Sequence, residues 1–195
     1  MVESTSPELI PNLLNEKTDF CIIVSETDNP DICSIPVSEE QSLLYISDSA
    51  LSQFCPEHYE YLISNKQISI PIGYFKKCPF ILNTPGNRVR KKCDDLFATN
   101  GIVPNIIFSS ANAMNLAQLA SQGFGATFLN SSTREESVQK LHRFKIEGLS
   151  AVQTLKVSYL RNRYLSRPAR RFIEIIREEL PKDTTLLQQS ALEMW

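Results

Sequence analysis

Residues 109–130 read SSANAMNLAQLASQGFGATFLN, and this stretch decides the class of fold. Its apolar residues are spaced as one face of a helix from Asn112 to Gln122, and Gly123 is the expected end of that helix. The apolar run 126–129 then predicts a buried strand. None of these residues is charged, although 22% of the chain is. The stretch predicts a helix–strand unit whose polar groups are only amides and hydroxyls.

The same alternation of strands and helices continues along the chain. Short runs of apolar residues predict strands over 19–24, 32–37, 42–46, 80–82, 104–109, 126–129, 143–146 and 154–159. Apolar positions at helical spacing predict helices over 7–14, 56–63, 88–100, 132–141 and 167–180, with a polar turn at 38–40. Strands that alternate with helices of this length predict a parallel-rich α/β fold, whose ligands bind beyond the carboxyl ends of the strands.

Composition and charge exclude several classes of function. The chain has 195 residues and is 42% apolar, which suits one globular domain or two small lobes. Its net charge of -2 argues against nucleic-acid binding by this chain itself. The basic run 88–92 is followed by Asp94 and Asp95, so we interpret it as a solvated helix face. The N-terminus, MVESTSPEL, is no export signal and no run is long enough to span a membrane, so we expect a cytoplasmic protein with reduced thiols.

The sequence contains no recognisable catalytic, metal or cofactor motif. Its two histidines, His58 and His142, lie outside any nucleophile motif that we recognise. The segment 55–58 has the spacing of two zinc ligands, but no second pair completes a site. Gly-Phe-Gly at 123–125 lacks the third glycine of a dinucleotide-binding loop. We therefore expect no enzyme activity, no metal and no cofactor.

Five segments, in this order, resemble the effector-binding domain of LysR-type transcriptional regulators. They are VESTSPEL (2–9), LLNEKTDFCIIV (13–24), PFILNTPGNRVRKKCDDLFATNGIVPNIIF (79–108), LASQGFGATFLN (119–130) and YLRNRYLSRPARRFIEIIREEL (159–180). Each segment alone is a weak signal, but five in the right order are a strong one. The sequence departs from the family in lacking the winged helix-turn-helix, the linker helix and the effector domain's first strand–helix unit. Asn130 and Ser49-Ala50 also stand where the family has proline and His-Pro.

The resemblance implies a fold and a function. The fold is a two-lobed α/β fold of the type 2 periplasmic-binding-protein class, with mixed sheets, flanking helices and an interlobe cleft. We expect lobe I to contain residues 1–78 and 160–195, and lobe II residues 79–159. In the family a metabolite in the cleft changes lobe or subunit geometry and so alters DNA binding by the helix-turn-helix region. The expected partners are a small-molecule effector, a second copy of the chain, and DNA only through a domain that this chain lacks.

Candidate ligand-binding residues lie at helix starts and strand ends. The N-terminus of the helix after Ser109, Ser110 and Asn112 offers unpaired N–H groups and partial positive charge, which suits a carboxylate or other anion. The alternative is an ordinary cap on a buried helix. The resemblance adds Thr5 and Ser6, whose alternative role is again capping. The further candidates follow strand ends and are otherwise turn residues: Ser47, Asn83, Thr84 and Asn130.

Other functions remain open from the sequence. A solute-binding protein of the same fold in transport is one, although no export signal is found. An enzyme of a related two-lobed fold, such as a deaminase or a dehydratase, would need an acid, a base or a metal in the cleft. A fragment that binds no ligand is the third alternative.

Overall fold

The computed structural model describes residues 6–24, 28–65, 69–133, 136–149 and 152–179. The chain divides into two compact units. Unit 1 contains residues 1–40 and 152–195, and unit 2 contains residues 41–151.

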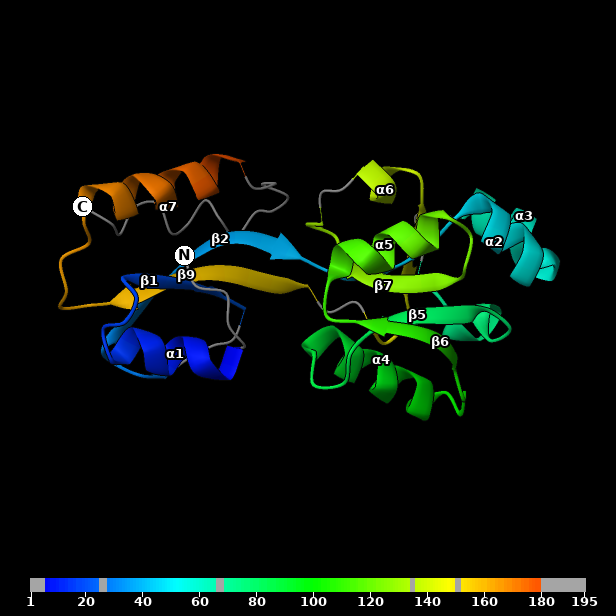
Figure 1. Cartoon of the computed structure of the whole chain (residues 1–195), viewed down its shortest axis with the longest axis horizontal. Helices are drawn as coiled ribbons and strands as arrows, with labels where there is room; N and C mark the ends of the chain where they lie inside the picture. Colours follow the sequence, from blue (N-terminus) through cyan, green and yellow to red (C-terminus); the bar gives the residue numbers. More distant parts are fainter. Residues whose placement is uncertain (1–5, 25–27, 66–68, 134–135, 150–151, 180–195) are drawn as a thin grey trace. The chain divides into compact units, whose positions relative to one another are not determined.

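Unit 1 is a small antiparallel sheet with a helix on each face. Its strands are β1 (Phe20–Ile23), β2 (Ile32–Glu40) and β9 (Gln153–Leu160), in the order β1-β9-β2. Helix α1 (Ser6–Leu14) packs on one face through Leu13, and α7 (Arg167–Glu179) packs on the other through Ile173, as Figure 1 shows. Because side chains alternate along a strand, both faces bury apolar residues.

The division between the units differs from the expected one. Residues 38–40 do not form a turn: they continue β2, and Ser38 and Glu40 are buried. The next strand, β3 (Ser42–Ile46), belongs to the other sheet, so the units divide after residues 40 and 151 and not after 78 and 159. The reason is that every side chain of β3 is buried, which makes it a central strand of unit 2.

Unit 2 is built on a six-stranded mixed sheet. Besides β3 it contains β4 (Ser69–Ile70), β5 (Pro79–Asn83), β6 (Asn105–Ser110), β7 (Ala126–Asn130) and β8 (His142–Ile146), in the order β4-β8-β3-β7-β5-β6. Strand β5 runs parallel to β6 and β7, and β4 runs parallel to β8, whereas β3 is antiparallel to β7 and β8. The mixed sheets implied by the family resemblance are confirmed. Parallel pairing, which the strand–helix alternation predicted, is found around β5 and between β4 and β8, and the antiparallel β3 separates these two regions.

Helices cover both faces of this sheet. One face is covered by α2 (Asp48–Phe54), the 3-10 turn η1 (Pro56–His58), α3 (Tyr59–Ser64), the 3-10 turn η2 (Ile72–Phe75) and α4 (Arg88–Thr99). The other face is covered by α5 (Ala113–Ser121) and the short α6 (Glu136–Gln139). Figure 1 shows α5 and α4 on opposite sides of the strands. The sequence did not predict α2, β4 or η2.

The segment that opened the sequence analysis forms β6, α5 and β7 as expected. The Asn112 side chain accepts a hydrogen bond from the Met114 N–H at 2.8 Å, and Gly123 ends α5 with φ +88°. Gly125 allows β7 to approach β5, because a Cβ there would lie 2.2 Å from the Pro79 carbonyl oxygen. Capping side chains and one close approach of two backbones thus hold the β6–α5–β7 segment in place.

Candidate functional site

The carboxyl ends of β5, β6 and β7 meet at one edge of the sheet in unit 2. Asn83 at the end of β5 is in register with Ser110 at the end of β6. Since Phe80 is in register with Ala126, Asn130 ends β7 at the same edge. Helix α4 begins after β5 and α5 begins after β6 (Figure 1), so both helix N-termini lie there. We call the predicted residues at this edge the carboxyl-edge cluster: Asn83, Thr84, Ser109, Ser110, Asn112 and Asn130.

Hydrogen bonds join the two loops that carry this cluster. The Thr84 N–H donates to the Ser110 carbonyl at 3.2 Å, and the Asn112 N–H donates to Ser110 Oγ at 3.1 Å. Ser109 and Asn112 are exposed, Thr84 and Ser110 are half-buried, and Asn83 is buried. The cluster therefore offers polar atoms to solvent on a backbone that is held from both strands.

The start of α5 retains hydrogen-bond donors. Asn112 accepts from the Met114 N–H through its side chain and from the Leu116 N–H through its carbonyl. No described residue accepts from the N–H groups of Ala113 or Asn115, as the geometry of a first helical turn requires. These donors and the helix dipole place partial positive charge at the edge without a cationic side chain.

The start of α4 adds a cation that sequence reasoning missed. The Arg90 side chain is only 13% exposed; its Nη1 donates to the Asn83 carbonyl at 2.9 Å and its Nε to Asp94 Oδ1 at 2.8 Å. Arg90 is therefore no part of a solvated face, unlike the exposed Arg88 and Lys91. The available signal was an arginine in the first turn of α4 with an acid four residues later. Asp94 offsets much of its charge.

Asn130 is fastened to the segment that enters unit 2. The Ser42 hydroxyl donates to Asn130 Oδ1 at 3.3 Å. One residue further on, the Gln41 N–H donates to Ser131 Oγ at 3.0 Å and the Ser131 N–H donates to the Gln41 carbonyl at 2.8 Å. This end of β7 is thus bonded to the first residues of unit 2.

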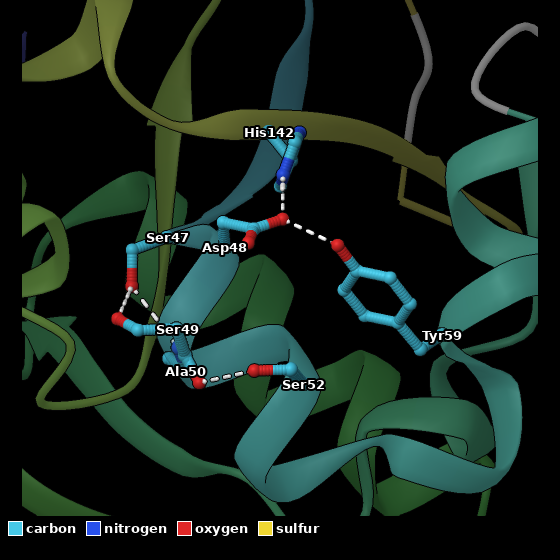
Figure 2. Close-up of polar contacts among 7 residues, drawn as sticks. All are labelled: Ser47, Asp48, Ser49, Ala50, Ser52, Tyr59 and His142. Carbon is cyan, nitrogen blue, oxygen red and sulfur yellow. Dashed lines mark hydrogen bonds and ion pairs between the residues drawn. The ribbon is translucent and has the colours of Figure 1, made fainter.

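Ser47 is not part of the carboxyl-edge cluster. Strand β3 is antiparallel to β7, with Ser42 opposite Asn130, so Ser47 lies roughly 15 Å along the strand, at the opposite edge. Its hydroxyl accepts from the Ala50 N–H at 3.2 Å and shares a 3.1 Å hydrogen bond with the Ser49 hydroxyl (Figure 2). It is 6% exposed. Ser47 caps α2, which was the alternative interpretation of a polar residue after a strand.

The opposite edge also carries a charged network that the sequence did not reveal. Asp48 Oδ1 accepts from the Tyr59 hydroxyl at 2.7 Å and contacts His142 Nε2 at 2.9 Å, as Figure 2 shows. The hydrogen bond to Asp48 raises the pKa of the Tyr59 phenol. We call Asp48, Tyr59 and His142 the opposite-edge network. It fastens α2 and α3 to the start of β8.

The remaining predicted residues lie in or before α1. Thr5 lies outside the described residues, and Ser6 is the first residue of α1 in unit 1. Within the described ranges, no group of three or more His, Cys, Asp or Glu side chains is placed to hold a metal ion. No helix in those ranges is long and apolar enough to cross a bilayer.

Comparison with known proteins identifies the class of the chain. Residues 1–181 match the LysR substrate binding domain, so the chain belongs to that family. The resemblance drawn from the sequence is therefore confirmed. The family is a regulatory, ligand-sensing domain and not a catalytic one.

Individual relatives agree with this assignment. The uncharacterized HTH-type transcriptional regulator YcgK of Bacillus subtilis (strain 168) is 30% identical over 115 residues, which are 59% of this chain and 35% of that protein. The effector binding domain of QuiR in complex with shikimate has a TM-score of 0.59 at 19% identity, covering 90% of this chain and 78% of that one. The regulatory domain of Synechocystis PCC6803 CcmR in complex with 2-PG has a TM-score of 0.62 at 16% identity, covering 88% and 77%. These structural similarities establish the fold.

Proposed function

We propose that this chain senses a small anionic metabolite, which binds at the carboxyl-edge cluster of unit 2. The observation that carries the proposal is the start of α5, where exposed Ser109 and Asn112 lie beside the N–H groups of Ala113 and Asn115. Oriented N–H groups and hydroxyls bind a carboxylate without a buried lysine. Membership of the LysR family and the ligand complexes of QuiR and CcmR support a small-molecule effector.

The charge pattern favours an anion over a cation. None of the residues from Ser109 to Asn130 is acidic, and the positive ends of α4 and α5 both lie at this edge. A cationic ligand would meet two helix N-termini and, in the cluster itself, no carboxylate. Asp94, the nearby acid, is already bonded to Arg90.

Binding acts on a longer protein in this proposal. The segment that matches the relative YcgK covers 35% of that regulator. Binding shifts an equilibrium between two arrangements of units or subunits, to the extent that the anion has different affinities for them. That shift controls DNA binding by a helix-turn-helix region elsewhere in the protein, in the cytoplasm. A helix-turn-helix in the same reading frame would support this role, whereas an export signal there would favour solute transport.

Self-association is part of the proposal and has a surface to support it. Strand β6 is at the edge of its sheet, has no charged residue, and exposes Ile107 and Phe108 by 48% and 42%. Uncharged edge strands with exposed apolar side chains are rare on monomers. A second copy of the chain is the occupant that we propose for this surface.

Thermal unfolding with a panel of anions tests the site. Acetate, sulfate, phosphate and short dicarboxylates are added at rising concentration with ionic strength held constant by chloride. An anion that binds only the folded chain stabilises it by about 2.7 kcal/mol at 100 times its Kd. The double variant Ser109→Ala/Asn112→Ala is expected to lose this gain.

The matched control is Ser47→Ala/Ser52→Ala, which also removes one cap and one exposed hydroxyl, but at the opposite edge. It is expected to keep the full response to anions. Equal responses of the parent and the Ser109→Ala/Asn112→Ala variant, or no response to any anion, would remove the proposed site.

A further inference from the structure

A buried amide lies at the carboxyl edge, and no described residue forms a hydrogen bond with it. Asn83, the last residue of β5, is only 7% exposed, although asparagine side chains are mostly found at protein surfaces. Its backbone carbonyl accepts from Arg90 Nη1 at 2.9 Å, but its side chain has no partner within the described ranges. The hydrogen bonds of such a group are usually completed by a ligand or an ordered water.

The amide lies on the face of the sheet that α5 covers. Side chains alternate along β5, so that Leu82 packs in the hydrophobic cluster with α4 and Ile81 packs in the cluster with α5. Asn83 is on the same side as Ile81, two residues nearer to the carboxyl edge. Its partner in register on β6 is Ser110, whose Oγ accepts from the Asn112 N–H directly before α5. The amide and the start of α5 therefore share one face and one edge of the sheet.

The backbone around this amide is held from two sides. Arg90 donates to the Asn83 carbonyl, and the Thr84 N–H donates to the Ser110 carbonyl at 3.2 Å. The Arg90 guanidinium is also bonded to Asp94, at 2.8 Å. A side chain whose backbone is already fixed and whose position is buried loses little conformational freedom when it binds a ligand. The amide is thus prepared for a hydrogen-bonding group that the chain itself does not supply within the described ranges.

We infer that Asn83 is a specificity-determining residue, and that the effector is a hydroxy acid whose hydroxyl lies close to its carboxylate. The inference rests on the proposed function, because the carboxylate is the group that binds at the start of α5. An amide has a donor, Nδ2, and an acceptor, Oδ1, and a hydroxyl also donates and accepts, so the two groups satisfy each other. A carboxylate that carries hydrogen in place of the hydroxyl leaves the buried amide unpaired.

Other polar groups fit this position less well. A second carboxylate only accepts hydrogen bonds, so it pairs with Nδ2 and leaves Oδ1 of Asn83 unsatisfied. An ammonium group only donates hydrogen bonds, and it meets the positive end of α5 at the same edge. A neutral hydroxyl avoids both costs.

Matched carboxylates that differ by one hydroxyl test the inference. The pairs are glycolate with acetate, and lactate or its β-hydroxy isomer with propionate, all of which are ionised at neutral pH. Thermal unfolding at rising concentration and constant ionic strength gives the dissociation constant of each. The parent chain is expected to bind at least one hydroxy acid about tenfold more tightly than its partner, since only the hydroxy acid satisfies the amide.

Two variants assign the preference to Asn83. Asn83→Leu replaces the amide with an apolar group of similar volume, and is expected to abolish the difference in affinity within each pair. The control Asn105→Leu makes the same change at the exposed first residue of β6, at the other end of the paired strands, and is expected to keep the difference. A preference that persists in Asn83→Leu would overturn the inference.

Failure of the inference and failure of the proposed function give different results. Equal affinities within every pair in the parent chain would overturn the inference, leave the anion site standing, and show that water completes the bonds of Asn83. Binding of none of these carboxylates would overturn both. The comparison in the parent chain decides the inference even if Asn83→Leu does not fold.

Discussion

The two edges of the sheet in unit 2 each begin a helix with a capping side chain, yet they differ in what the cap leaves available. At the opposite edge, Ser47 is buried and Asp48 at the start of α2 is bonded to Tyr59 and His142. At the carboxyl edge, Asn112 is exposed and the next residues are uncharged. The difference teaches that a cap alone does not mark a binding site, since helix starts need caps for stability. The exposure of the capping side chain and the charge of the residues after it distinguish the two edges.

The largest loss of stability is expected from a substitution that disturbs the sheet shared by both edges. In Gly125→Ala the new Cβ would lie 2.2 Å from the Pro79 carbonyl oxygen, so β7 and β5 must separate. We expect a loss of about 3 kcal/mol in the free energy of unfolding, measured with urea. The control, Gly73→Ala, meets no atom within 4 Å and is expected to stay within about 0.5 kcal/mol of the parent. Equal stabilities of the two variants would show that β7 does not need this close approach.

Removing the two capping side chains one at a time compares the two edges directly, with a smaller expected effect on stability. Asn112→Ala and Ser47→Ala each remove an acceptor for a backbone N–H and are each expected to cost about 1 kcal/mol without ligand. With a bound anion, only Asn112→Ala is expected to lose additional stability. Urea unfolding without the anion measures the cost of each substitution, and unfolding with the most stabilising anion measures how much of the anion's stabilisation remains. A larger loss of anion stabilisation in Ser47→Ala would place the site at the other edge.

The smallest effect concerns the opposite-edge network. Asp48 is 65% exposed, so Asp48→Asn is expected to cost at most about 1 kcal/mol. The clearer readout is the Tyr59 phenol, whose raised pKa should fall to its ordinary range in the variant. In the parent, the hydrogen bond stabilises the fold while the phenol is protonated, and this contribution is lost as the pH rises through the raised pKa. Ultraviolet titration of tyrosine measures the shift; identical curves would show that Asp48 does not hold Tyr59.

Local features were predictable from the sequence because their chemistry is local. Asn87 and Asn112 accept hydrogen bonds from helix N–H groups, and Gly101 and Gly123 follow the helix ends with positive φ, all as their residue types indicate. The strand–helix–strand unit of residues 105–130 was therefore predicted nearly to its boundaries.

Features that depend on strand pairing were not predictable in this way. Ser47 follows a strand, like Asn83, and only the antiparallel pairing of β3 with β7 places it at the other edge. Polar residues 38–40 were interpreted as a turn, although pairing with β9 extends β2 through them. Arg90 belonged to a basic run, and its burial depends on contact with the Asn83 carbonyl across a loop. Each error concerns contacts between residues that are distant in sequence or separated by a turn.

The paired hydrogen bonds between Gln41 and Ser131 lie where the polypeptide leaves one half of the molecule and enters the other, directly after Glu40. Ser131 is the neighbour of Asn130. A metabolite that displaced Asn130 would therefore act directly on the peptide at Glu40 and Gln41, because the neighbouring Ser131 is hydrogen-bonded to Gln41.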